Sequence, residues 1–224
     1  MTDHPHRALL RTPLVTPPPV QVLVLAKQPL AGRVKTRLSP PFTPQGAADV
    51  AEAALLDTLE TVRAVDVARR VLVLDGDYPA PGFDVQPQRG GPMDERLGAA
   101  FDDAAAAAPG LATLLVGMDT PQLTPALLAD AIARLTRHAA VLGLAPDGGW
   151  WTLGLQRPDG ALLTGVPTSR DDTGARQLAR LRAAGLDPHL LPELRDVDTV
   201  ADAREVAALA PHSRFAAAVG ALAS

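Results

Sequence analysis

Short apolar runs rich in β-branched residues alternate along the chain with longer segments in which apolar residues recur every three or four positions. The short runs predict buried strands, and the longer segments predict helices that bury one face. We expect strands over residues 20–26, 70–75, 83–88, 111–117, 139–145, 150–155 and 188–191. We expect helices over residues 44–65, 93–108, 125–138, 171–184, 199–209 and 211–223.

Strands and helices alternate through most of the sequence, and several of the strands are continuously apolar. Continuously apolar strands are typical of parallel sheets, in which helices cover both faces. The pattern therefore predicts an α/β fold, with a mostly parallel sheet sandwiched by helices, in a single domain over residues 20–224. Residues 1–19 are rich in proline and lack this pattern, so we expect a mobile N-terminal tail there.

Composition excludes several classes of function. The chain has 25 acidic and 21 basic residues and a formal net charge of −4, which does not favour nucleic-acid binding. It contains no cysteine, which excludes disulfides and thiolate metal sites and suits a reducing compartment. No apolar run approaches the roughly 20 residues of a membrane span. We expect a cytoplasmic protein that binds neither nucleic acid nor membrane.

The loop after the first strand gathers positive charge around a glycine. Only two of the 21 basic residues are lysines, and both lie here with two arginines and the glycine: Lys27, Gly32, Arg33, Lys35 and Arg37. Ligands of open α/β sheets bind at the carboxyl ends of strands. Forked guanidinium donors, compact ammonium groups and a glycine that lets backbone approach all suit an oligophosphate. Neither a Walker A motif nor G-x-G-x-x-G is present, so we predict a different phosphate loop; the alternative is a solvated basic loop.

Carboxylates follow two other predicted strands. Asp119 comes directly after the strand over residues 111–117, and Thr124 already supplies the capping signal for the next helix. A carboxylate in that place can hold Mg²⁺ or Mn²⁺ against phosphate oxygens; the alternative is a turn or capping residue. Asp196 and Asp198 lie two apart in an extended segment, so their carboxylates share one side. One of them could be a second metal ligand and the other an arginine or helix partner; the alternative is a charged loop.

The segment Asp147-Gly148-Gly149-Trp150-Trp151 joins a glycine pair to two indoles. Glycines give access to the backbone, and flat apolar faces suit stacking on a sugar or base. The two indoles must point to opposite faces of a strand, so we expect only one of them in a site. We expect Asp147 to face that site. The alternative is a hairpin turn followed by a strand with one indole in the core.

Taken together and in order, these motifs resemble a bacterial glycosyltransferase-A-like family, one branch of which takes its name from arsenosugar biosynthesis. The resemblance spans about residues 20–205 and is carried by AKQPLAGRVKTRL (26–38), GGPMDERL (90–97), GMDTP (117–121), DGGWW (147–151) and RDVDT (195–199). It implies the Rossmann-like nucleotide-diphospho-sugar transferase fold. Small nucleotidyltransferases share that fold, including the guanylyltransferases of deazaflavin-cofactor synthesis.

The resemblance also implies roles for single residues. It places the four cations Lys27, Arg33, Lys35 and Arg37 along the nucleotide phosphates. It places Asp119 and Asp198 at a Mg²⁺ or Mn²⁺ ion, and it places Asp147, Gly148, Gly149 and Trp150 on the side of the sugar or acceptor. Lys35 and Asp147 are then the catalytic candidates. Two departures concern the acceptor side: tryptophans stand where the family often has tyrosine, and residues 167–174 lack the expected Trp-Ser-Thr form.

Two reactions and one non-catalytic function follow from this interpretation. In the first, the donor is a nucleotide-sugar, and a hydroxyl of a small-molecule acceptor attacks the anomeric carbon with Asp147 as base. In the second, an acceptor phosphate attacks the α-phosphate of a nucleoside triphosphate and pyrophosphate leaves. The number of cations favours the second reaction, and the resemblance favours the first. A non-catalytic nucleotide-binding protein is the third interpretation, although Asp119 and both lysines are present.

Overall fold

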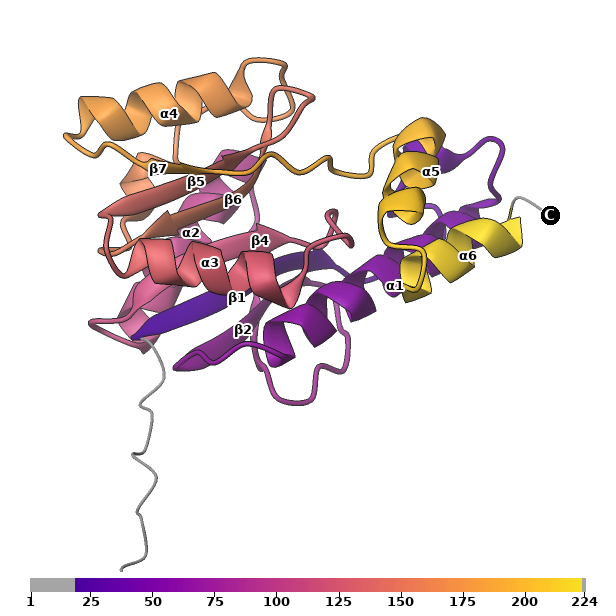
Figure 1. Ribbon diagram of the computed structural model, residues 1–224, viewed down its shortest axis with the longest axis horizontal. Coiled ribbons are helices and arrows are strands. Elements are labelled where there is room, and N and C mark those ends of the chain that lie inside the picture. The colour runs from indigo at the N-terminus through magenta and orange to yellow at the C-terminus, as the bar shows by residue number, and fades with distance from the viewer. Residues whose placement is uncertain (1–18, 223–224) are drawn as a thin grey trace, which may run out of the picture.

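The computed structural model describes residues 19–222, which form a seven-stranded sheet with helices on both faces (Figure 1). The strands are β1 (Val20–Lys27), β2 (Arg69–Asp75), β3 (Asp84–Pro87), β4 (Ala112–Gly117), β5 (Ala140–Leu144), β6 (Trp150–Leu155) and β7 (His189–Leu191). The helices are α1 (Pro44–Arg63), α2 (Met93–Ala107), α3 (Pro125–Leu135), α4 (Thr173–Ala183), α5 (Val200–Leu209) and α6 (Arg214–Leu222). Two short 3₁₀ turns are η1 (Thr36–Leu38) and η2 (Gly160–Leu162).

Two expectations concern the ends of the chain and a membrane span. The predicted N-terminal tail lies outside them except for Pro19, whose carbonyl accepts a hydrogen bond of 3.0 Å from the backbone of Ala112. Within residues 19–222, no helix has both the length and the apolar character needed to cross a membrane. The cytoplasmic location stays a prediction.

The strands of the sheet are ordered β3-β2-β1-β4-β6-β5-β7. β6 runs antiparallel to β4 and β5, and every other neighbouring pair is parallel. The predicted mostly parallel sheet is therefore confirmed. The reversal of β6 has a simple cause, because only residues 145–149 join β5 to β6. A parallel pair needs a crossover of about a dozen residues or more, whereas a hairpin needs only a short turn.

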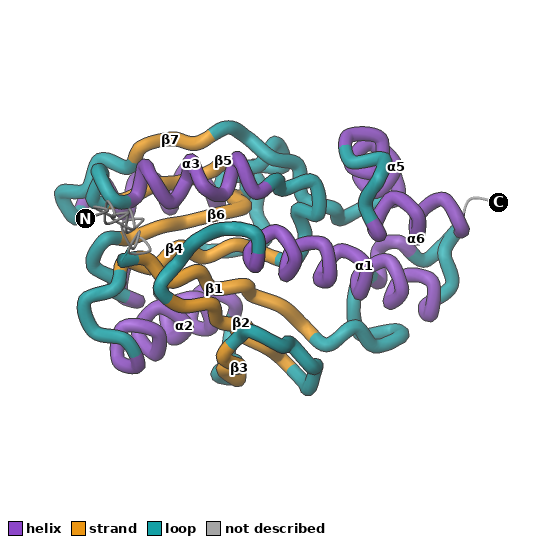
Figure 2. Tube along the Cα trace, turned by 60° about the horizontal axis from the view of Figure 1, so that its bottom comes forward, coloured by secondary structure: helices purple, strands orange, loops and turns teal. Residues whose placement is uncertain are grey.

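Apolar side chains cover both faces of the sheet, and β1 shows how. Val22 and Val24 belong to the cluster beneath α1 and α3, whereas Leu23 belongs to the cluster beneath α2 and α4. Figure 2 shows α3 and α2 on opposite sides of the strands. Burying one such side chain contributes about 1.5–3 kcal/mol. Double-sided burial explains why the strands are continuously apolar in sequence.

Three helices, α1, α3 and α5, begin at the local capping signals that the sequence predicts. The hydroxyl of Thr43 accepts a hydrogen bond of 3.0 Å from the backbone of Gly46, and Thr124 caps α3 in the same way. Thr199 and Asp202 form a capping box at α5, with both reciprocal hydrogen bonds present. A cap of this kind stabilises a helix by about 1 kcal/mol.

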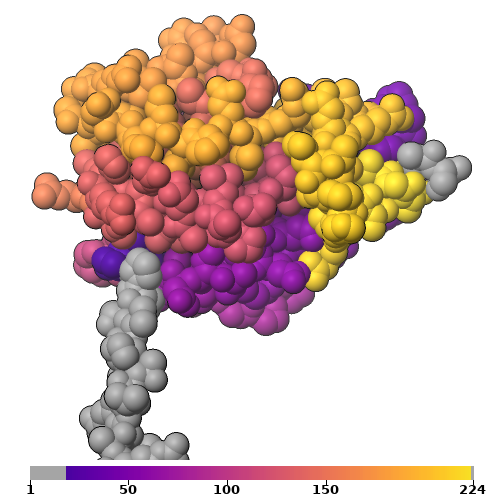
Figure 3. Space-filling view, in the orientation of Figure 1, coloured from indigo at the N-terminus to yellow at the C-terminus, as the bar shows by residue number. Residues whose placement is uncertain are grey.

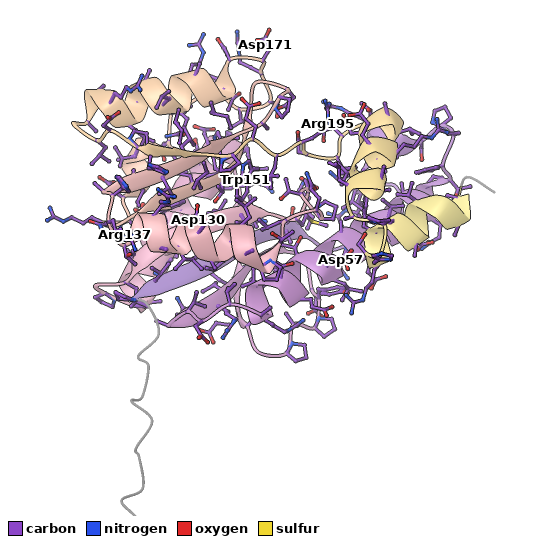
Figure 4. The ribbon with its side chains drawn as sticks, in the orientation of Figure 1. Asp57, Asp130, Arg137, Trp151, Asp171 and Arg195 are labelled. Atoms are coloured by element: carbon purple, nitrogen blue, oxygen red, sulfur yellow. The ribbon has the colours of Figure 1, made fainter. Side chains whose placement is uncertain are left out.

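A third apolar cluster joins the C-terminal helices to the basic loop. α6 packs against α1, and α5 packs against α6, where the yellow surface meets the purple one in Figure 3. Leu38 and Phe42, which follow the basic loop, and Val197, which precedes α5, are buried in this cluster. The guanidinium of Arg214 on α6 lies 3.1 Å from the carboxylate of Asp57, which Figure 4 shows on α1. The cluster therefore fixes two segments that carry predicted site residues.

Candidate functional site

The predicted site segments meet at the carboxyl edge of the parallel strands. Lys27 ends β1 and pairs in register with Asp75 at the end of β2. The segment between β7 and α5 crosses this edge, as Figure 1 shows. The backbone N–H of Val197 donates to the carbonyl of Asp119 over 2.9 Å. This bond holds the 195–198 segment against the end of β4, so residues far apart in sequence share one site.

Lys35 contacts the residues that follow β4 and β7 at this edge of the sheet. Its ammonium lies 2.5 Å from Oδ1 of Asp119 and 3.9 Å from Oδ1 of Asp198, and it also donates to the carbonyl of Val197. The side chain is only 10% exposed. The backbone of Lys35 has φ 46°, a left-handed conformation that costs a non-glycine residue about 1–2 kcal/mol. The structure thus places Lys35 between the two carboxylates that the sequence predicts as metal ligands.

Of the other three cations of the loop, one is paired with a carboxylate and two are not, within the part of the chain that the structure describes. Arg37 lies 2.7 Å from Oδ2 of Asp198 through its guanidinium. Lys27 and Arg33 are exposed, and neither forms an ion pair with another residue in the range 19–222. Gly32 has φ 75° and would have open space around an added Cβ, as expected of a glycine at a loop apex. The loop therefore offers two free cations and two that already hold carboxylates.

Two adjoining clefts open at this edge. The first has a volume of about 300 Å³ and is lined by all four loop cations together with Gln88, Met93 and Met118. The second has a volume of about 390 Å³ and is lined by Asp147, Gly149, Asp196, both tryptophans and residues of the 168–173 loop. Asp119 and Asp198 line both clefts. One elongated site therefore has a basic half and an acidic half, within the range of volumes typical of small-molecule sites.

The predicted glycine turn is the hairpin between β5 and β6. The backbone N–H of Gly149 donates to Oδ1 of Asp147 over 2.8 Å. Gly148 has φ 89°, and a Cβ placed on it would come within 1.9 Å of the carbonyl oxygen of Asp171. The carbonyl of Gly148 also accepts a hydrogen bond of 2.7 Å from the backbone of Gly174. The residues at the start of α4 therefore pack closely against the turn. This close packing leaves no room for a side chain at residue 148.

The two tryptophans point to opposite faces of β6, as the alternation of a strand predicts. Trp151 belongs to the apolar cluster beneath α1 and α3, is 3% exposed, and donates its indole N–H to the carbonyl of Pro192 over 3.0 Å. Figure 4 shows it in the middle of the fold. Trp150 packs against the other cluster and keeps part of its surface exposed. Both tryptophans line the second cleft, and Trp150 is the more exposed of the two.

Asp196 is a site residue that the sequence does not single out from its neighbour Asp198. Burial, followed by the negative charges of Asp147, Asp198 and Asp119, raises the pKa of the Asp196 carboxyl to about 6. This electrostatic coupling shows that four carboxylates from three chain segments lie near one another. The Asp-x-Asp spacing in an extended segment is the sequence signal that points to both members of the pair.

The carboxylate pair Asp119 and Asp198 fits a divalent cation. Within residues 19–222, no three acidic or histidine side chains form a ready metal site. The two carboxylates nevertheless converge on a single positive charge, the ammonium of Lys35. Mg²⁺ usually takes one or two protein carboxylates and completes its shell with phosphate oxygens and water. The donor set therefore suits an ion bound together with a phosphate, once Lys35 has released the carboxylates.

Solved structures share this fold. A candidate nucleotide-diphospho-sugar transferase from Desulfovibrio desulfuricans G20 superposes with a TM-score of 0.83 at 24% identity, over 91% of this chain and 96% of that one. A CMP:2-keto-3-deoxy-manno-octonic acid synthetase complexed with CTP gives a TM-score of 0.52 at 13% identity, over 86% and 98%. A 2-C-methyl-D-erythritol 4-phosphate cytidylyltransferase from Thermus thermophilus gives 0.51 at 21% identity, also over 86% and 98%. These similarities establish the predicted nucleotide-diphospho-sugar transferase fold.

The sequence comparisons identify the family. None of the curated proteins matches the sequence significantly. The family DUF2064 matches residues 58–170, a segment that contains Asp119 and the Asp147 hairpin. The basic loop precedes this segment and Asp198 follows it, and the narrower resemblance to the arsenosugar branch stays a prediction. The chain belongs to DUF2064, a family described as uncharacterized proteins conserved in bacteria.

Proposed function

We propose that this protein is a nucleotide-dependent transferase that moves a glycosyl group from a nucleotide-sugar to a hydroxyl of a small-molecule acceptor. The observation that carries the proposal is the junction of a basic cleft and an acidic cleft at Asp119 and Asp198. A nucleotide-sugar has an anionic diphosphate joined to an uncharged sugar. The diphosphate matches the basic half in charge, and the hydroxyls of the sugar can donate hydrogen bonds to the carboxylates of the acidic half. The three structures compared above, which share the fold, include a candidate transferase and two enzymes that use nucleotides.

The basic half would hold the diphosphate. Lys27 and Arg33 are exposed at the end of β1 and have no carboxylate to satisfy within the described residues. A hydrogen bond to a charged group contributes about 1.5–3 kcal/mol, so two such contacts suit two phosphates. Gly32 adds a stretch of backbone without side-chain obstruction.

Asp119 and Asp198 would hold the divalent cation in the centre of the site. A bound Mg²⁺ or Mn²⁺ would offset the negative charge that develops on the leaving nucleoside diphosphate. Lys35 would then turn from Asp119 to the phosphates, since its ammonium is nearly buried and needs an anionic partner.

The acidic half would hold the sugar and the acceptor. Asp147 keeps one carboxylate oxygen on the backbone of Gly149, which fixes the orientation of the other oxygen. That second oxygen would accept the proton of the attacking hydroxyl in an inverting transfer. Trp150 would offer its exposed face to a sugar ring. The 168–173 loop, which the resemblance assigns to the acceptor, lines the same cleft.

Nucleotidyl transfer is the second candidate function, and the four cations around the first cleft favour it. A triphosphate carries more negative charge than a diphosphate and could use all four. In that reaction the same loop would hold the β- and γ-phosphates, and an acceptor phosphate would attack the α-phosphate. The acceptor would then have to bring a phosphate into a cleft in which carboxylates, among them Asp147 and Asp196, outnumber the guanidinium groups of Arg37 and Arg170. Repulsion between the phosphate and these carboxylates is unfavourable.

A thermal-shift panel separates the two candidates at the level of binding. The full chain is melted with nucleoside triphosphates, nucleoside diphosphates and nucleotide-sugars, each with and without Mg²⁺. Glycosyl transfer predicts that a nucleotide-sugar and its diphosphate raise the melting temperature in the presence of Mg²⁺. Stabilisation by triphosphates alone, with pyrophosphate released on turnover, would overturn it. Asp119→Asn is the control, because it should lose the part of the shift that depends on Mg²⁺.

A further inference from the structure

The ammonium of Lys35 occupies the position toward which the two predicted metal ligands point. It lies 2.5 Å from Asp119 and 3.9 Å from Asp198, and it is the only lysine or arginine within 4.0 Å of both carboxylates among residues 19–222. Arg37 reaches the other oxygen of Asp198, which leaves Oδ1 directed at Lys35. A divalent ion and this ammonium therefore compete for the same pair of carboxylates.

The backbone conformation of Lys35 directs its side chain toward the two carboxylates, and a neighbouring carbonyl accepts a hydrogen bond from the ammonium. Lys35 has a left-handed φ of 46° at the start of η1, and its ammonium donates to the carbonyl of Val197. Leu38, three residues later, is fully buried in the cluster made by α1, α5 and α6. The loop that carries Lys35 is thus anchored in the folded protein, and Lys35 is not a freely moving surface residue.

We propose that Lys35 blocks the divalent-cation site of the ligand-free protein, so that the metal binds strongly only when the phosphates of the donor are present. The inference rests on the proposed function, because it takes Asp119 and Asp198 as the metal ligands. Without a phosphate, an entering metal leaves the nearly buried ammonium beside a divalent cation and without an anion. With a phosphate present, the ammonium moves to the phosphate and the carboxylates become available. Metal and donor then bind cooperatively, and each raises the affinity of the other by the same factor.

The test measures Mn²⁺ binding to the full chain without nucleotide, using the electron paramagnetic resonance signal of free Mn²⁺ and no turnover. Lys35→Met removes the ammonium and keeps a side chain of similar length, so its Mn²⁺ affinity should exceed that of the unaltered protein by tenfold or more. Lys27→Met is the matched control, because it removes the same charge from the same loop but from a lysine that contacts neither carboxylate. Its Mn²⁺ affinity should stay within twofold of the unaltered protein.

Two further variants make every outcome decisive. Lys35→Gln should repeat the gain if Lys35→Met fails to fold, as judged by its melting curve. Adding Asp119→Asn to Lys35→Met should abolish the gain, which assigns the bound Mn²⁺ to these carboxylates. Equal or weaker Mn²⁺ binding by both Lys35 variants would overturn the inference, and so would an equal gain in Lys27→Met. If the inference fails in either way, turnover of the donor by the unaltered protein would still support the proposed function. Failure of the inference is therefore distinguishable from failure of the proposed function.

Discussion

Replacing Gly148 with alanine tests how the hairpin that carries Asp147 is held in the site. Gly148 and Gly110 both have φ 89°, so alanine pays about the same 1–2 kcal/mol of left-handed strain at either position. The two positions differ in what a Cβ would meet. At Gly148 the new Cβ would lie 1.9 Å from the carbonyl oxygen of Asp171, whereas at Gly110 nothing lies within 4 Å. Since such contacts do not fall below 3.0 Å, the backbone must move by at least 1.1 Å (3.0 − 1.9).

That movement adds an overpacking cost to the strain. Overpacking typically costs about 1–3 kcal/mol, so Gly148→Ala should lose about 3 kcal/mol of unfolding free energy and Gly110→Ala about 1 kcal/mol. Urea denaturation followed by tryptophan fluorescence measures both, because Trp150 and Trp151 begin the strand that follows the hairpin. Equal losses in the two variants would refute the close contact between the hairpin and the start of α4.

Three further predictions concern the charges of the site. The pKa of Asp196 is raised from 3.8 to about 6 in the folded protein, so its ionisation costs stability as the pH rises through that window. Asp196→Asn should therefore gain about 1–2 kcal/mol at pH 8 in urea denaturation with EDTA, after discounting for its partial exposure. The gain should vanish at pH 4, and a flat pH profile for Asp196→Asn would contradict the coupling. Lys35→Ala should weaken donor binding in the presence of Mn²⁺ by about 1–3 kcal/mol in calorimetric titration, and an unchanged affinity would show that Lys35 does not reach the phosphates. Asp119→Asn should keep the melting temperature of the metal-free protein within a few degrees and abolish metal-dependent turnover, so full turnover would refute its role as a metal ligand.

The elements of the fold follow from local sequence signals. Each strand and helix expected from the hydrophobic pattern is present, with bounds that differ by a few residues. The apolar runs identify the strands because both faces of the sheet are buried, and Thr43, Thr124 and Thr199 identify helix starts because capping is local. The strand order and the apolar cluster that α1 shares with α5 and α6 depend on contacts between distant segments. No local pattern contains that information.

In the candidate site, too, some features follow from local sequence signals and others depend on contacts between distant segments. The strand-end rule correctly brings the basic loop, Asp119, the Asp147 hairpin and Asp198 to one edge. Sequence alone does not show that Lys35 already has carboxylate partners, because those partners lie 84 and 163 residues away along the chain. Nor does it show that Asp196 rather than another acid has its pKa raised by burial and by neighbouring charges, because both effects arise only in the folded protein.

The most direct test of the proposed function is product analysis with the full chain. The protein is incubated with nucleotide-sugars of different bases and with nucleoside triphosphates, each with Mg²⁺ or Mn²⁺ and with a mixture of small hydroxylated and phosphorylated acceptors. Glycosyl transfer predicts release of a nucleoside diphosphate from at least one nucleotide-sugar, dependent on the metal and lost in Asp119→Asn. Release of pyrophosphate from a triphosphate, with every nucleotide-sugar left intact, would contradict glycosyl transfer and establish nucleotidyl transfer in its place.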